Sequence, residues 1–257
     1  MAAFEWLVVT YFSVLTVAAW FVPVPPARRL YATAVGLGVS SLALAVALAA
    51  GPTARSWMPH IYLIAGYWMP ALLVPTSQGR RFEDWLRKSD EGLRRRLPGV
   101  PSLFSPLLEL AYLLCYPLVP LSFTVIWLNG DSGAVERFWL AVLLAGYACY
   151  ATLPWLVSRP PRALLMPAPP SGALAGMNTL VLGRVSHQLN TFPSGHVAVA
   201  GAAVASVATV SEPAGALLGL AVAGISIGAA AGRYHYVVDV VLGLAVAAVA
   251  FLIAAGA

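Results

Sequence analysis

The chain of 257 residues is 60% hydrophobic and only 10% charged, and its mean hydropathy is +0.81. A soluble domain carries roughly 25% charged residues, so this composition argues against an ordinary soluble protein and predicts one membrane domain over residues 1–257. The net charge of +5 favours anionic headgroups or phosphates as partners. No segment resembles a nucleic-acid-binding module.

Long apolar runs follow one another along the chain, and each is close to the length of a membrane-spanning helix. Proline and glycine residues separate the runs. We therefore predict an all-α, multi-pass bundle of about eight transmembrane helices in a plasma or inner membrane, with the first two spans in residues 1–59. The predicted spans are about 4–22, 31–50, 60–76, 103–128, 137–157, 194–211, 214–232 and 236–255.

The polar segment 77–102 combines apolar and basic residues at helical spacing, which predicts an amphipathic helix at the membrane interface. The helix either serves only as an anchor or also collects anionic lipid headgroups beside a functional site, and the sequence leaves both readings open. Its apolar residues are Phe82, Trp85, Leu86, Leu93 and Leu97. Its basic residues are Arg80, Arg81, Arg87, Lys88, Arg94, Arg95 and Arg96.

The second long loop, 158–193, begins with Arg159 and Arg162 on either side of two prolines. Proline stiffens the loop, and the guanidinium fork matches the oxygens of a phosphate. The two arginines are therefore candidate phosphate ligands, although a basic flank of a membrane span has the same composition. The loop also contains Arg184, His187 and Asn190.

The segment Pro193-Ser194-Gly195-His196 precedes the next apolar run. Ser194 is a good N-cap residue, and the backbone N–H groups of a helix N-terminus attract anions. His196 beside such an anion site is placed to donate a proton to a leaving oxygen. The alternative is a capped helix start with an incidental histidine.

His235 and Asp239 stand four residues apart at the head of the last apolar run. On a helix they would face the same way. Asp239 would then orient one ring nitrogen of His235 and leave the other free to act as a nucleophile. The alternative is an interfacial histidine paired with an acid. Alternation of the spans places Arg159, His196 and His235 on one face, where we expect them to converge.

These three segments resemble the signatures of the type 2 phosphatidic acid phosphatase superfamily. Arg159-Pro160 matches part of the first signature, Pro193-Ser194-Gly195-His196 matches the second in full, and His235 with Asp239 matches the third. The resemblance covers about residues 103–255. The Arg-Pro-Pro-Arg and Arg-Tyr-His-Tyr forms resemble the branch that contains inositol-phosphorylceramide synthases.

The chain departs from the family pattern at three positions. Thr152 stands at the lysine of the first signature, and Gly228 and Ala229 stand at the serine and arginine of the third. Arg233 follows four residues after Ala229, which is about one helical turn. We therefore expect Arg233 to reach the same phosphate.

The resemblance implies a six-helix core within residues 60–257 and a metal-independent, cofactor-free lipid-phosphate phosphatase. His235 would attack a lipid phosphomonoester or diphosphate and form a phosphohistidine, with Asp239 orienting it and His196 acting as general acid and base. The partners would be the lipid phosphate substrate and membrane lipids. The groups expected to hold the phosphate are Arg159, Arg162, Ser194, Gly195 and Arg233.

Two other functions remain open at this stage. The same site in a phosphotransferase would pass a phosphoryl headgroup to an alcohol. An anion transporter is a different class, favoured by Glu109 within an apolar run, because intramembrane carboxylates often mark ion paths. The sequence does not decide which side of the membrane carries the site. Most basic residues share the face of the site, which favours the cytoplasmic side. Most members of the family that the chain resembles work on the outer or lumenal face.

Overall fold

The computed structural model describes residues 1–76, 80–97, 102–165 and 172–257, and over these ranges it is a helical bundle, as predicted. The single β-type pairing in the described ranges is an isolated bridge between Ser158 and Asn190. Residues 77–79, 98–101 and 166–171, which belong to the two predicted long loops, lie outside the described residues. The helices are α1 (Ala3–Ala18), α2 (Pro26–Ala49), α3 (Pro52–Trp57), α4 (Pro59–Leu72), α5 (Arg81–Arg94), α6 (Ser105–Leu113), α7 (Cys115–Asn129), α8 (Ser132–Tyr150), α9 (Pro161–Leu165), α10 (Ala173–Val185), α11 (Gly195–Ala208), α12 (Glu212–Ala231) and α13 (Val237–Ala255).

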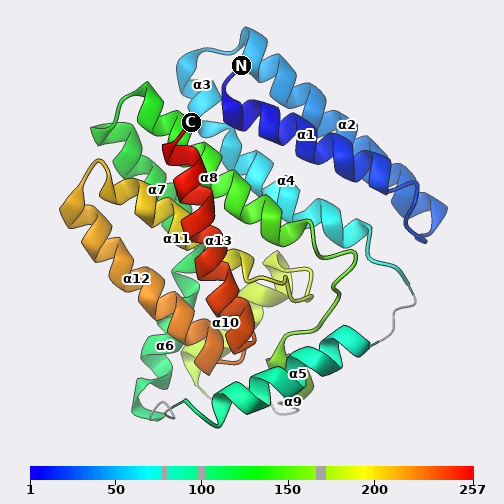
Figure 1. Ribbon diagram of the computed structural model, residues 1–257, viewed down its shortest axis with the longest axis vertical. Coiled ribbons are helices and arrows are strands. Elements are labelled where there is room, and N and C mark those ends of the chain that lie inside the picture. The colour runs from blue at the N-terminus through cyan, green and yellow to red at the C-terminus, as the bar shows by residue number, and fades with distance from the viewer. Residues whose placement is uncertain (77–79, 98–101, 166–171) are drawn as a thin grey trace.

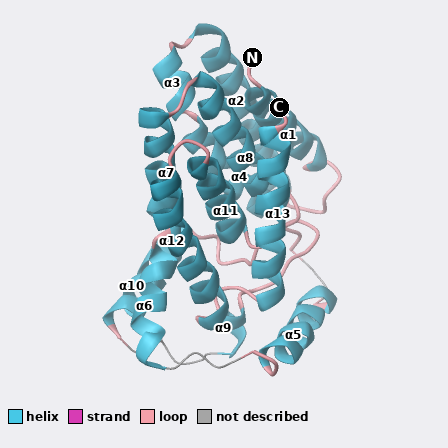
Figure 2. Cartoon of the chain, turned by 60° about the vertical axis from the view of Figure 1, so that its left-hand side comes forward, coloured by secondary structure: helices cyan, strands magenta, loops and turns pink. Residues whose placement is uncertain are grey.

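Helix α11 occupies the centre of the bundle and packs against α7, α8, α12 and α13 (Figure 2). Its sequence consists largely of alanine, glycine and valine, and most of these residues are buried. Small side chains allow neighbouring helices to approach closely in a membrane protein. The central position of α11 fixes its first residues, Gly195 and His196, among the ends of the surrounding helices.

The N-terminal helices α1 and α2 pack against each other and against α4, and α1 also packs against α8. The rings of Tyr11 and Tyr147 stack here with centroids 3.8 Å apart. The Tyr11 hydroxyl donates a hydrogen bond to the carbonyl of Gly66. These contacts therefore join α1 to α8 and to α4.

Each of the eight predicted spans contains at least one helix, but the lengths differ. Among the described residues, α2, α12 and α13 are long and apolar enough to cross a membrane, and the bent pair α6–α7 is a fourth if it counts as one span. Helices α1 and α11 are apolar but have only 16 and 14 residues. These helices fit an integral membrane protein, while the number of eight spans is not confirmed.

The predicted span 103–128 is broken at Leu114, where α6 and α7 meet at an angle of 52°. Pro117 accounts for the break, because its nitrogen cannot donate to the carbonyl of Leu113 and its ring crowds that carbonyl. Helix α12 packs against α6, where a Cβ atom on Gly228 would lie 2.7 Å from the carbonyl oxygen of Leu108. This close approach places α6 against the C-terminal end of α12.

Helix α5 forms the central part of the predicted amphipathic segment. In Figures 1 and 2, α5, α9 and the turn between α12 and α13 lie at the end of the molecule opposite both termini. The face of α5 that packs on the protein holds Glu83, Leu86 and Asp90, all buried. Trp85 is 50% exposed. Most of the aromatic and basic surface of α5 therefore faces outward, and its inner face is largely acidic.

Helix α10 was missed in the predicted loop 158–193. It contains 13 mostly apolar residues, Ala173–Val185, and packs against α6. Its N-cap residue is Gly172, which has a φ of +112°, a conformation that glycine adopts at little cost. Helix α10 brings Asn178 beside Glu109 of α6.

Candidate active site

The two histidines lie side by side although 39 residues separate them in the sequence. Nδ1 of His196 is 3.4 Å from Nε2 of His235, and the ring planes are inclined by 62°. His196 is the second residue of α11, and His235 lies in the turn before α13. The packing of α13 against α11 therefore creates the pair.

His235 precedes the helix rather than belonging to it, which corrects the expected helical spacing to Asp239. Tyr236 is the N-cap residue of α13, and Asp239 is the third residue of its first turn. The backbone N–H of Tyr236 donates to Oδ2 of Asp239 at 3.1 Å. His235 Nδ1 lies 3.6 Å from the same oxygen. The chain reversal at the cap, and not the helical repeat, brings the ring toward the carboxylate.

Asp239 is fully buried and held by a second group. The side-chain amide of Asn190 donates to Oδ2 of Asp239 at 2.8 Å and to Oγ of Ser158 at 3.2 Å. The backbone N–H of Asn190 also donates to the carbonyl of Ser158. This arrangement fixes the carboxylate that faces His235, and it makes Asn190 a positioning residue that the sequence did not identify.

Ser194 and Gly195 join the site differently from the prediction. The backbone N–H of Ser194 donates to the carbonyl of Asp239 at 3.0 Å, and Ser194 is the N-cap residue without a side-chain cap. Its buried hydroxyl has no partner among the described residues. The backbone N–H of Gly195 donates a hydrogen bond of 3.2 Å to the hydroxyl of Thr191. The Ser194 hydroxyl is therefore a donor of this segment that no group among the described residues engages.

Arg159 is held by an acid from α5. Its guanidinium donates to both carboxylate oxygens of Glu83, at 2.8 and 3.0 Å, and its backbone N–H donates to Oε2 at 3.0 Å. These hydrogen bonds lower the pKa of Glu83 and raise that of Arg159. The carbonyl of Arg159 accepts a hydrogen bond from the hydroxyl of Tyr236. Arg159 thus contacts the residue after His235 while its charge is neutralised by Glu83.

Arg162 and Glu109 form a second cluster beside the turn. Arg162 lies 3.4 Å from Oε1 of Glu109 and 4.6 Å above the ring of Tyr234. Glu109 also accepts hydrogen bonds from the Tyr234 hydroxyl and from Asn178. The Tyr234 ring stacks on Tyr112. Glu109 is therefore paired with groups on three other segments.

Thr152 and Ala229, at which the sequence departs from the signatures that it resembles, have structural roles. The hydroxyl of Thr152 donates to the carbonyl of Phe192, and so it ties α8 to the segment before Ser194. The carbonyl of Ala229 accepts hydrogen bonds of 3.0 Å from the N–H groups of both Tyr234 and His235. These contacts shape the turn that holds His235, and neither position contributes a cation to it.

Arg233 lies in the turn two residues before His235 and has a φ of +59°. Its side chain lines a pocket of about 250 Å³ together with residues of α5 and α9, and that lining includes neither histidine. Its expected contact with a phosphate at His235 remains a prediction. Arg184 is an exposed residue near the end of α10.

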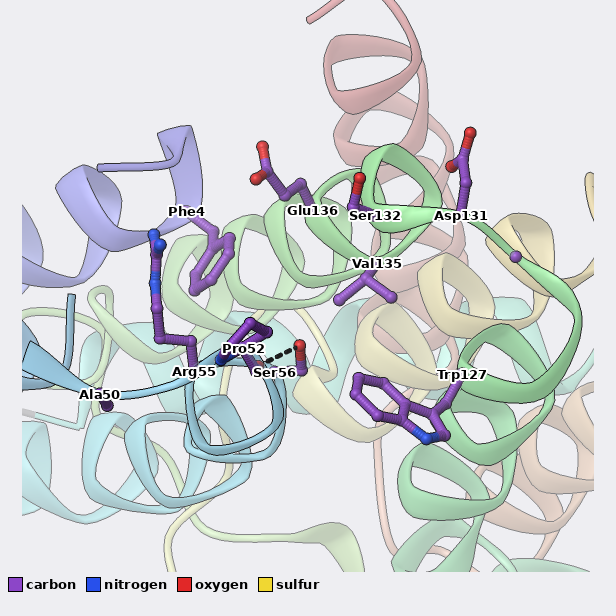
Figure 3. Close-up of a pocket in the computed structure, with 11 residues that line it drawn as sticks. Phe4, Ala50, Pro52, Arg55, Ser56, Trp127, Asp131, Ser132, Val135 and Glu136 are labelled. Atoms are coloured by element: carbon purple, nitrogen blue, oxygen red, sulfur yellow. Dashed lines mark hydrogen bonds between the residues drawn. The ribbon is translucent and has the colours of Figure 1, made fainter.

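A larger pocket of about 460 Å³ lies near the opposite end of the molecule, lined by residues of α1, α3, α7 and α8 (Figure 3). Arg55 at this pocket is paired with Glu5 at 2.7 Å, and Asp131 caps α8 by accepting from the N–H of Ala134. These charges stabilise helix ends. In the described part of the chain, no group of three or more His, Cys, Asp or Glu side chains is placed to hold a metal ion.

Comparison with protein-family models, with curated proteins and with solved structures found no match for this chain. The site must therefore be judged on its geometry. Two acids of α5 were not recognised as part of it: Glu83, which binds Arg159, and Asp90, which accepts from the N–H of Val237. Their spacing of seven residues on α5 would place both on one helical face, which is the one signal that the sequence offered.

Proposed function

We propose that the protein is a membrane lipid-phosphate phosphatase that works through a phosphohistidine. The observation that supports this function most is the approach of His196 Nδ1 to His235 Nε2, 3.4 Å, beside a buried carboxylate. A nucleophile, a second proton-transferring group and an orienting acid are the parts that covalent phosphoryl transfer needs. They lie in the bundle at the end where α5 presents an interfacial surface.

In the proposed first step, the lone pair of His235 Nε2 attacks phosphorus, and the bond from phosphorus to the lipid oxygen breaks. His196 gives its proton to that oxygen, so the lipid leaves as an alcohol, or as a lipid monophosphate when the substrate is a diphosphate. In the second step, His196 takes a proton from water as the water oxygen attacks phosphorus. The bond between nitrogen and phosphorus then breaks and releases inorganic phosphate. Asp239 favours the tautomer with the proton on Nδ1 of His235, which leaves Nε2 free.

The resting geometry sets a condition on substrate binding. Reacting atoms must approach to about 3–3.5 Å, and the two histidine nitrogens are already 3.4 Å apart. A phosphoryl group between them must therefore separate the rings. His196 is the ring that moves in our account, because it is only partly buried whereas His235 is buried.

The phosphate also needs donors, and we assign this role to the free Ser194 hydroxyl and to Arg159. Binding of a phosphate competes with Glu83 for the guanidinium of Arg159, which is 42% exposed. Arg162 supplies positive charge from farther away across Tyr234. We further propose that α4, the α6–α7 pair, α8, α11, α12 and α13 are the six spans of the catalytic core.

The experiment that tests this function is product analysis with the purified full-length chain in mixed micelles. Phosphatidic acid, phosphatidylglycerol phosphate and a polyprenyl diphosphate are the substrates, each with and without an added alcohol. Release of inorganic phosphate from at least one lipid, lost in His235→Gln, supports a phosphatase. A new headgroup ester without free phosphate would instead identify a phosphotransferase, and no turnover of any lipid would contradict both.

A further inference from the structure

Helix α5 is fastened to both ends of the turn that holds His235. Oδ1 of Asp90 accepts a hydrogen bond of 2.7 Å from the N–H of Val237, the first residue of α13. Nη2 of Arg94 donates to the carbonyl of Ala230 at the end of α12, also at 2.7 Å. Backbone groups at helix ends lack partners within their helix, and here α5 provides them. The geometry of the turn therefore depends on where α5 lies.

Beside these contacts, α5, α9 and the turn enclose a pocket of about 250 Å³. Four arginines and two acids line it, which leaves two positive charges in excess. Arg94 already pairs with Asp90 at 2.5 Å. The guanidinium groups of the other three arginines are therefore available to bind an anion. The charged lining residues are Arg87, Asp90, Glu91, Arg94, Arg95 and Arg233.

Arg233 is held in this pocket at a conformational cost. Its φ of +59° lies in the left-handed region, which is unfavourable for a residue other than glycine. Its carbonyl accepts from the N–H of Arg162, and its own N–H donates to Ala230. Among the described residues its guanidinium forms no hydrogen bond or ion pair. A strained backbone that presents an unpaired cation to a pocket indicates a ligand.

We propose that this pocket binds the phosphate of an anionic phospholipid that is not the substrate, and that the bound headgroup holds α5 against the catalytic turn. Guanidinium groups bind phosphate oxygens through paired hydrogen bonds. The substrate phosphate belongs elsewhere, because the lining contains neither His196 nor His235. The site goes beyond the proposed function, and its occupancy does not require catalysis.

The exposed surface around the pocket favours a lipid, and not a soluble molecule, as the source of the bound phosphate. Trp85 and Leu97 of the same segment are 50% and 52% exposed, and exposed apolar residues beside basic ones place a helix in the headgroup region. The pocket that α5 lines then lies at the depth of lipid phosphates. A soluble phosphate offers the same oxygens but lacks the acyl chains that would hold it there.

The test is a calorimetric titration of the full-length chain in neutral detergent with short-chain phosphatidylglycerol, a phosphodiester without a terminal phosphate. We expect saturable binding of one lipid, with inorganic phosphate at least tenfold weaker. Arg233→Gln and Arg87→Gln should each weaken lipid binding about tenfold, equivalent to about 1.4 kcal/mol. Arg96→Gln removes the same charge from the exposed part of the same segment, outside the pocket lining, and should change the affinity less than twofold.

Three results would overturn the assignment. Equal weakening by Arg96→Gln and Arg233→Gln would indicate diffuse surface charge, and inorganic phosphate that binds as tightly as the lipid would remove the lipid as the ligand. Loss of binding in a folded His235→Gln variant would place phosphatidylglycerol in the substrate site. Because the titration needs no turnover, a protein that binds the lipid but hydrolyses nothing would contradict the proposed function alone.

Discussion

The side-chain amide of Asn190 donates a hydrogen bond of 2.8 Å to Oδ2 of Asp239, and the two residues are 1% and 0% exposed. The same carboxylate oxygen lies 3.6 Å from Nδ1 of His235. Asn190 therefore determines how the acid faces the ring, although it does not touch the ring nitrogens itself. Mutation can therefore separate the contribution of Asn190 from those of Asp239 and His235.

Asn190→Ala should lower the free energy of unfolding by about 1–3 kcal/mol, because a buried acceptor loses its donor. Thermal unfolding in detergent measures this effect. If Asn190 positions Asp239, the pH–rate profile of the variant should also shift, which a purely structural residue would not cause. Asn129→Ala is the matched control, since Asn129 is exposed and bonds only within its own helix. Equal stability of the two variants would contradict the role of Asn190.

Gly195→Ala should disturb the start of α11. An added Cβ atom would lie 2.3 Å from Cε1 of Tyr150, and overpacking of this kind costs about 1–3 kcal/mol. We expect a lower unfolding temperature and partial recovery when Tyr150→Leu is added. Gly219→Ala is the control, because a Cβ atom there meets nothing within 4 Å. An unchanged unfolding temperature for Gly195→Ala would show that Tyr150 moves freely.

Glu83→Gln should loosen α5 from Arg159 and from the turn that holds His235. The hydrogen bonds from Arg159 lower the pKa of Glu83, so the pair stabilises the fold above the ordinary glutamate pKa and ceases to do so as the pH falls through the lowered value. Hydrogen exchange of the α5 amides should therefore quicken in Glu83→Gln at neutral pH and in the wild type only under acidic conditions. Asp84→Asn, an exposed neighbour, should exchange like the wild type at neutral pH. Equal exchange in both variants at neutral pH would show that the pair does not hold α5.

Turnover should persist in excess EDTA. In the proposed mechanism His235 supplies the nucleophile and His196 the proton, so no step calls for a metal ion. The measurement is phosphate release before and after addition of chelator, with magnesium then added back. Loss of activity that magnesium restores would contradict the mechanism.

The sequence predicted the helices well because apolar length and the positions of proline and glycine decide them locally. It placed His196 and His235 on one face by alternation of the spans, and the structure brings their rings together. Helix α10 was missed because the loop was read from its proline-rich start at Ser158. The break at Leu114 was missed because residues 103–128 were read as one apolar run.

The contacts that arrange the charges depend on partners far apart in the chain. Glu83 meets Arg159 across 76 residues, and Asp90 meets Val237 across 147. The spacing of Glu83 and Asp90 places both acids on one face of a helix but does not reveal their partners, so Arg159 was expected to be free for phosphate and α5 was expected to contribute only basic and apolar residues. The helical spacing predicted for His235 and Asp239 was likewise wrong, because Tyr236 caps the N-terminus of α13 and the helix begins only at Val237, after His235.

Trapping of labelled phosphate on the protein tests the phosphohistidine mechanism most directly. The full-length chain is mixed with lipid labelled in its terminal phosphate and quenched in alkali, where a phosphohistidine is stable, and a second portion is quenched in acid, where it is not. We predict label on the wild type that survives alkali and is lost in acid, slower labelling of His196→Ala because the leaving oxygen lacks its proton donor, and no label on His235→Gln. Label on folded His235→Gln, or a bond that survives acid, would contradict nucleophilic attack by His235.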